Sequence, residues 1–256
     1  MPINVNGNSL NSVGAKILVD TQIVTSGLMM YLDCGIATSY PGSGTVWYDL
    51  SGNGYNFNIN SSAYNNSGGV KYMDFNGSYG CAKIGTDVPT PSGSEFTYIV
   101  WTRVKNSTAE WRTLTRGLSA GPDHQVIIES GGWRIGMYDN TNGTGFNTDG
   151  YSQQSLPNYG TSKWICMHWR FYNSSPYYRM SYNDTPGTIR SSITSVNARI
   201  KGGFCSIGAY NNGSQTDVNA SSQPWGDIAS FQLYNRTLSD SEILQNYLVH
   251  RGRFGL

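Results

Sequence analysis

The C-terminal part of the chain contains a strand followed directly by a capped helix, and this order strongly constrains the fold. Residues Ile228–Tyr234 are aromatic and rich in β-prone side chains. Ser239 stands three residues before Glu242, the spacing of a capping box, in which the two residues satisfy each other's backbone N–H groups at a helix N-terminus. We therefore predict a strand over 228–234, a helix from about 240 to about 249, and a helix end closed by Gly252.

Strand signals recur along the rest of the chain, separated by clusters of Gly, Asn, Ser and Pro that are typical of turns. Residues 164–172 alternate between apolar and wetter positions, whereas both faces of 96–104 are largely apolar, as in a central strand. The predicted strands are Leu28–Asp33, Lys71–Phe75, Glu95–Lys105, Arg112–Arg116, Gln125–Glu129, Trp133–Asp139, Lys163–Tyr172, Tyr177–Asn183, Phe204–Tyr210 and Asp227–Tyr234. They predict an all-β fold, a two-sheet antiparallel jelly-roll sandwich with one short C-terminal helix.

The composition suits such a sandwich. The chain has 256 residues, a length at which all-β sandwiches often form a single domain. Its 7 Trp, 18 Tyr and 8 Phe supply a large core. Only 13% of residues are charged, against roughly 25% in an average soluble protein, so amides and hydroxyls dominate the surface. Such a surface can pack against proteins or sugars at little desolvation cost.

Four stretches of the sequence resemble one known family. Residues 226–243 read G-D-I-A-S-F-Q-L-Y-N-R-T-L-S-D-S-E-I, residues 49–56 read D-L-S-G-N-G-Y-N, and residues 27–33 and 96–105 resemble the opening strand and a later strand of that family. Together they are similar to concanavalin A-like, laminin-G-type jelly rolls. The resemblance implies the sandwich fold, and its subtype is frequent in virion proteins of tailed phages. Because this fold hosts enzymes, lectins and spacers, it does not decide the function.

Residues 1–25 differ from the rest of the chain because they contain no Trp, Tyr or Phe. We predict that they form an extended N-terminal arm outside a sandwich domain of residues 26–256. The arm is either a frayed terminus or an attachment segment that orders against a partner. The apolar run Ile17-Leu18-Val19 favours attachment, because these side chains need burial. The first residues lack the basic and apolar regions of a signal peptide, so we expect assembly in the cytoplasm.

The charge and cysteine patterns argue against several kinds of partner. The net charge of +1 gives no electrostatic basis for binding nucleic acid or an anionic membrane. No segment approaches the roughly 18 apolar residues of a membrane span, so we expect no membrane insertion. The four Cys are widely spaced and form no C-x-x-C pair, so we expect reduced thiols and no zinc site.

The acidic residues do not form a pattern typical of a glycan-cleaving enzyme. Such enzymes need two carboxylates flanking one bond, and same-face partners on a strand are spaced i, i+2. The only acids with that spacing are Asp240 and Glu242, which lie in the predicted helix cap. The E-x-D-x-x-E pattern of laminarinase-like glucanases is absent, and the three His form no triad or metal motif. We expect no enzymatic activity. A glycoside hydrolase stays a second alternative, because carboxylates can converge from different strands.

The Gly-rich loop at 49–56 carries oxygen groups of the kind that calcium prefers. Asp49 and Asn53 are the candidate metal ligands, and Asp33 and Asp227 stand at strand ends expected at the sandwich edge. No motif requires a cofactor, so Ca²⁺ would be an accessory ion. In the alternative interpretation, Asp49 and Asn53 form Asx turns that satisfy their own backbone without metal.

Aromatic residues in or near predicted loops are candidates for stacking against sugar rings. The candidate ligand-binding residues are Trp111, Trp133, Tyr151 and Trp225, framed by polar loops at 143–151 and 211–225. The alternative is that these side chains cap the sandwich and hydrogen-bond at its rim.

These observations lead us to predict a non-catalytic virion structural protein, a surface decoration or fibre-type module. Its arm would bind other virion proteins, and its sandwich would project from the virion surface after assembly in the host cytoplasm. Copies would pack against each other and would adhere to a host-surface glycan if the loop aromatics bind sugar. The alternative is a carbohydrate-binding lectin or receptor-binding protein. The viral setting is implied by the family resemblance alone.

Overall fold

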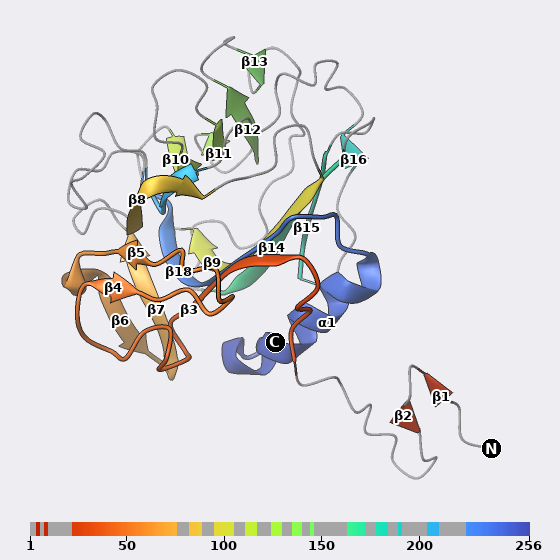
Figure 1. Ribbon diagram of the computed structural model, residues 1–256, viewed down its shortest axis with the longest axis horizontal. Coiled ribbons are helices and arrows are strands. Elements are labelled where there is room, and N and C mark those ends of the chain that lie inside the picture. The colour runs from red at the N-terminus through yellow and green to blue at the C-terminus, as the bar shows by residue number, and fades with distance from the viewer. Residues whose placement is uncertain are drawn as a thin grey trace.

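The computed structural model describes residues 22–75, 82–88, 95–104, 111–116, 163–172, 178–183, 204–209 and 224–256 (Figure 1). Within these ranges, only the backbone is described for residues 86–87, 111, 178 and 180. Outside them, the structure also describes the backbone of the strands at 4–5, 8–9, 124–129, 135–139, 144–145 and 189–190. Two of the short strands, β1 (Asn4–Val5) and β2 (Asn8–Ser9), pair with each other within the predicted arm.

Two antiparallel sheets form the body of the molecule. Sheet 1 has the strand order β13 (Thr144–Gly145), β12 (Ile135–Asp139), β11 (His124–Glu129), β10 (Trp111–Arg116), β17 (Phe204–Ile207), β8 (Ala82–Val88), β5 (Phe57–Asn58), β4 (Val46–Trp47). Sheet 2 has the order β16 (Ile189–Arg190), β15 (Tyr178–Tyr182), β14 (Ile165–Phe171), β9 (Phe96–Val104), β18 (Gly226–Tyr234), β7 (Val70–Phe75), β6 (Tyr64–Ser67), with β3 (Leu28–Asp33) also paired to β18. This architecture confirms the predicted all-β sandwich with one C-terminal helix.

The centre of sheet 2 is formed by β9 and β18, which are paired over most of their length. All nine residues of β18 are buried, as are eight of the nine residues of β9. This agrees with the apolar character of both faces of 96–104. On its other side, β18 pairs with β7 through Gly226–Ile228 and with β3 through Ser230–Tyr234, so β7 and β3 follow one another along the same edge. The register between β18 and β9 shifts between Ile228 and Ser230, at the point where the partner on the other edge of β18 changes from β7 to β3.

Each face of sheet 2 is covered by its own hydrophobic core. Between the sheets, the Phe204 ring packs edge-on against Tyr98 at 5.8 Å and also contacts Phe231 at 5.7 Å. On the outer face, Trp101 stacks on Phe254 with ring centroids 4.1 Å apart. Burying one such aromatic side chain contributes about 2–3 kcal/mol. The C-terminal helix is therefore held against sheet 2 by a second aromatic core (Figure 1).

The C-terminal helix α1 (Asp240–Arg251) begins at the predicted capping box. The Ser239 hydroxyl accepts from the Glu242 backbone N–H at 3.3 Å, and the Glu242 carboxylate accepts from the Ser239 N–H at 2.8 Å. Gly252 is the C-cap residue of α1, as predicted, but it does not have the left-handed conformation typical of a closing glycine. Gly252 has right-handed φ and continues into a 3-10 turn, η4 (Gly252–Phe254), and the left-handed glycine that ends the chain's helical part is Gly255 at φ 73°.

Several short strands were not predicted from the sequence. The strands β4, β5 and β6 have two, two and four residues, too few for alternation to be recognised, and β6 consists of Tyr-Asn-Asn-Ser. The strand β12 begins at Ile135, two residues after the predicted start at Trp133. A second 3-10 turn, η1 (Ser61–Ala63), precedes β6.

The last residues of the predicted arm already pack on the sandwich. Val24 is 7% exposed, its N–H donates to the Asn246 side chain at 2.8 Å, and its carbonyl accepts from the Tyr234 hydroxyl at 2.9 Å. The boundary at residue 25 stays a prediction, but residues 22–24 lie against α1 and β18.

The cysteines that the structure describes are all free thiols. Cys34, Cys166 and Cys205 are buried, and Cys81 lies outside the described residues. Burial raises the pKa of the Cys166 thiol, which keeps it protonated and unreactive. In the described part of the chain, no helix is long and apolar enough to cross a membrane.

Candidate functional site

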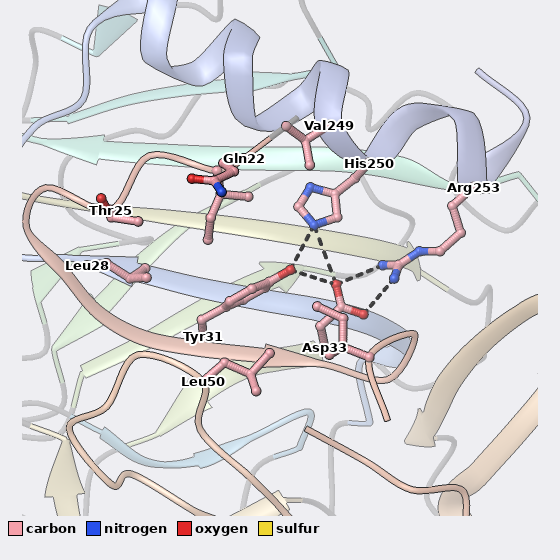
Figure 2. A pocket seen from close by; sticks show the side chains of 11 residues that line it. Gln22, Thr25, Leu28, Tyr31, Asp33, Leu50, Val249, His250 and Arg253 are labelled. Atoms are coloured by element: carbon pink, nitrogen blue, oxygen red, sulfur yellow. Dashed lines mark hydrogen bonds and ion pairs between the residues drawn. The ribbon is translucent and has the colours of Figure 1, made fainter. Parts of the chain in front are cut away.

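A pocket lies where the start of the sandwich domain meets the end of α1 (Figure 2). Its volume is about 460 Å³, within the roughly 300–1,000 Å³ usual for small-molecule sites. The polar side chains that line it are Gln22, Thr25, Tyr31, Asp33, His250 and Arg253. The aliphatic ones are Ile23, Leu28, Ile36, Leu50 and Val249. The pocket therefore has a hydrocarbon surface beside a set of hydrogen-bonding groups.

Asp33, the last residue of β3, is the central polar group. Its carboxylate is fully buried and forms a two-point ion pair with Arg253, with Nη1 to Oδ1 at 2.6 Å and Nη2 to Oδ2 at 3.1 Å. The Gly35 backbone N–H donates to Oδ1 at 2.7 Å, and the Tyr31 hydroxyl donates to Oδ2 at 3.1 Å. His250 Nε2 also lies 3.5 Å from Oδ2. A carboxylate has about four lone-pair positions, so these partners leave none of them open.

Burial alone would raise the pKa of Asp33. Hydrogen bonding from His250 and the charge and hydrogen bonds of Arg253 outweigh burial, and they hold the pKa below its ordinary value. The carboxylate is therefore ionised at neutral pH, with its charge balanced by the guanidinium.

Tyr31 connects the carboxylate to His250. Tyr31 and Asp33 lie two residues apart on β3, so their side chains share a face. The Tyr31 hydroxyl lies 3.0 Å from His250 Nε2 (Figure 2). On the other side of the ring, His250 Nδ1 donates to the Asn246 carbonyl at 2.9 Å. Burial and the neighbouring Asp33 raise the pKa of Tyr31, so the phenol keeps its proton.

The side chains predicted as calcium ligands make hydrogen bonds to backbone groups in the structure. Asp49 Oδ1 accepts from the backbone N–H groups of Tyr31 and Ser51, both at 2.9 Å, and Oδ2 accepts from the Tyr55 N–H at 3.1 Å. Asn53 Nδ2 donates to the Met29 carbonyl at 2.8 Å. The bond from the Ser51 N–H to Asp49 is the predicted Asx turn, whereas Asn53 bonds to the backbone of β3 instead of to its own turn. The loop thereby anchors β3 and positions Tyr31. Among the residues with described side chains, no cluster of three or more His, Cys, Asp or Glu could hold a metal ion.

Of the four predicted sugar-binding aromatics, the side chain of one is described. Trp225 is 0% exposed, and its indole N–H donates to the Thr102 hydroxyl at 2.8 Å. This burial favours the alternative in which the ring packs and hydrogen-bonds within the sandwich, and a ligand-binding role for Trp225 stays a prediction. Trp111 is the first residue of β10, and only its backbone is described, whereas Trp133 and Tyr151 lie outside the described residues.

The pocket cluster was not recognised in the sequence. Asp33 was noted only as a strand-end acid, and His250 and Arg253 stand more than 200 positions away from it. Each pair has a local signal of its own: Tyr31 and Asp33 lie two residues apart on one strand, and His250 and Arg253 lie three residues apart near the end of one helix. Nothing local indicates that the two pairs meet.

Comparisons with known proteins support the fold. No protein family and no curated protein matches the sequence. A sialidase of Trypanosoma rangeli, solved with 2,3-difluorosialic acid, matches with a TM-score of 0.58 and 15% identity over 95% of this chain and 35% of that one. The binding domain of botulinum neurotoxin serotype D matches with a TM-score of 0.57 and 12% identity, over 90% of this chain and 52% of that one. The binding domain of Paraclostridial mosquitocidal protein 1 matches at 0.53 and 14%, over 88% and 52%.

At these identities the likeness establishes the fold alone. The chain has a concanavalin A-like, lectin-type β-sandwich fold. It spans about a third of the length of the sialidase and about half of each toxin binding domain. The tailed-phage subtype stays a prediction from the sequence motifs.

Proposed function

We propose that this chain is a non-catalytic recognition module that binds a carbohydrate on a cell surface. The observation that carries the proposal is the preformed pocket at Tyr31, Asp33, His250 and Arg253, of ligand size and with apolar and polar parts. A lectin-type sandwich supports it, because two matched solved structures are binding domains and a third is a sialidase holding a sialic acid derivative. The lectin alternative from the sequence thus has more support than a purely structural role.

The chemistry of the pocket favours binding over turnover. Hydrolysis of a glycoside needs a proton donor and a second carboxylate that acts as nucleophile or base. Asp33 is the one carboxylate among the described residues that line the pocket, and its lone pairs already accept from Gly35, Tyr31 and Arg253. A carboxylate held in this way is poorly placed to attack or to take a proton. The same rigid pairing keeps the pocket open in one arrangement, which lowers the entropic cost of binding.

A paired measurement tests this proposal. The full chain is applied to an array of bacterial and animal surface glycans, and every glycan that it binds is incubated with the protein and examined for released sugar. We expect saturable binding without turnover. Release of product at a rate proportional to the protein concentration would contradict the non-catalytic assignment, and an array without any specific signal would contradict the carbohydrate assignment.

The setting is part of the same proposal. The resemblance of 226–243 and 49–56 to motifs frequent in tailed-phage virion proteins supports a place on a virion surface, with residues 1–25 as the attachment segment to other virion proteins. Immunolabelling of purified particles tests it. Labelled particles are the expected result, and a protein found only in the soluble fraction of the lysate would contradict it.

A further inference from the structure

We infer that the pocket at Tyr31, Asp33, His250 and Arg253 binds a single neutral sugar unit, a pyranose without an acidic group. The inference rests on the proposed function and specifies its ligand class and its site. It differs from what the sialidase similarity would suggest by analogy, because sialic acids carry a carboxylate. Three features of the pocket carry the argument: its charge balance, its two-part lining and its open rim.

The charge balance disfavours an anionic ligand. Arg253 is the cation in the pocket, and both of its terminal nitrogens are already bound to Asp33, at 2.6 and 3.1 Å. A ligand carboxylate would have to draw Arg253 away from Asp33, which is 0% exposed, or lie beside that carboxylate as a like charge. Leaving a buried charge without its partner is strongly unfavourable. A neutral ligand leaves the pair intact.

The lining matches the two kinds of surface of a pyranose. A sugar ring presents C–H groups on its faces and hydroxyls around its edge. Leu28, Leu50 and Val249 offer hydrocarbon surface for the C–H groups. The Tyr31 hydroxyl oxygen lies at the polar end (Figure 2), where its remaining lone pair can accept from a sugar hydroxyl.

The rim is open and polar. Gln22 and Thr25 line the pocket and are exposed, whereas Asp33 and His250 at its inner end are buried. A terminal sugar can therefore enter while the rest of a glycan chain continues into solvent. The loop at 49–56 fixes the strand that forms the inner wall, because Asp49 accepts from the Tyr31 backbone N–H at 2.9 Å.

Calorimetric titration at pH 8 with individual glycosides tests this inference. The neutral probes are methyl glycosides of glucose, galactose, mannose and N-acetylglucosamine, and the acidic probes are those of N-acetylneuraminic acid and glucuronic acid. We expect at least one neutral glycoside to bind, with the acidic ones weaker by at least about tenfold because of the buried-charge penalty.

Two tryptophan variants on the same helix locate the site. Val249→Trp fills the pocket, and Leu244→Trp places the same side chain on an exposed part of α1, where Leu244 is 41% exposed. We expect Val249→Trp to weaken neutral-sugar binding by at least about tenfold and Leu244→Trp to leave it unchanged. If Val249→Trp does not fold, as judged by circular dichroism, Tyr31→Phe replaces it, with an expected loss of about fivefold for one hydrogen bond.

The outcomes separate the inference from the proposed function. Neutral-sugar binding that survives in folded Val249→Trp, or in Tyr31→Phe where that variant replaces it, would place the ligand elsewhere and overturn the inference, while carbohydrate recognition itself would stand. Acidic glycosides that bind as tightly as neutral ones, and are lost in Val249→Trp, would overturn the ligand class. The absence of binding by every glycoside and every array glycan would overturn both.

Discussion

Removal of the Arg253 guanidinium is the sharpest test of how the pocket is held together. In Arg253→Met the hydrocarbon stem is largely kept, but the fully buried Asp33 carboxylate loses its cation. Breaking a buried ion pair from one side usually costs about 3–5 kcal/mol. Asp33 keeps its hydrogen bonds from Gly35 and Tyr31, and Arg253 is 23% exposed, so we expect the lower end, about 3 kcal/mol.

The pH dependence of this loss distinguishes a charge effect from a packing effect. In the native chain the folded-state pKa of Asp33 is below its ordinary value of 3.8, so the pair stabilises above that pH and the stabilisation is lost as the pH falls. In Arg253→Met burial is no longer offset by the guanidinium, and the pKa of Asp33 rises. The variant therefore carries the cost of an uncompensated buried carboxylate at neutral pH and loses this cost as Asp33 is protonated at lower pH. The unfolding free energies of the native chain and of Arg253→Met should then converge in acid.

Urea unfolding from pH 7 to pH 4, followed by tryptophan fluorescence, measures both effects. The matched control is the double variant Asp33→Asn/Arg253→Met, which removes the uncompensated charge and should recover part of the loss at pH 7. The reasoning would be refuted if Arg253→Met lost less than about 1 kcal/mol of unfolding free energy at pH 7, or if its loss did not depend on pH. It would also be refuted if the loss in the double variant equalled the sum of the losses in the two single variants.

Three other positions test the packing and the domain boundary. Burial lowers the pKa of His168 to about 4, against about 6.5 in the unfolded chain, so unfolding takes up a proton between these values. A pKa shift of 2.5 units corresponds to about 3 kcal/mol, so the free energy of unfolding should fall by that amount from pH 6.5 to 4. In His168→Gln this fall, measured by urea unfolding, should be much smaller. If the variant showed the same fall, His168 would not be its source. Gly208 has φ +95°, and a Cβ there would lie 2.2 Å from the buried Phe75 ring, so Gly208→Ala should cost about 3 kcal/mol or more in chemical denaturation, and a loss within error of zero would show that the contact relaxes freely. Deletion of residues 1–21 should leave the melting temperature unchanged but abolish incorporation into particles, whereas aggregation of the truncated chain would mean that the arm belongs to the core.

Much of the fold could be predicted because its signals are local. The β18–α1 junction combines an aromatic strand and a capping box within residues 228–242, and both signals indicate the same structure. The central position of β9 followed from its two apolar faces. By contrast, β4 and β5 have two residues each, and they form by pairing with neighbours rather than through any pattern of their own.

The site could not be predicted because it depends on tertiary contacts. Tyr31 and Asp33 come from the first strand of the sandwich, His250 and Arg253 from the end of the chain, and the antiparallel pairing of β3 with β18 brings them together. The burial of Trp225 could not be predicted for a related reason. Its polar neighbours suggested a loop, but Trp225 directly precedes β18, and its indole turns inward to the Thr102 hydroxyl.

The structure of the protein in complex with its best-binding neutral methyl glycoside tests the central claim most directly. The account predicts one sugar ring between Tyr31 and Val249, with the Asp33–Arg253 pair unchanged and no second carboxylate within reach of the glycosidic oxygen. A sugar bound at another part of the sandwich, or held between two carboxylates, would contradict it.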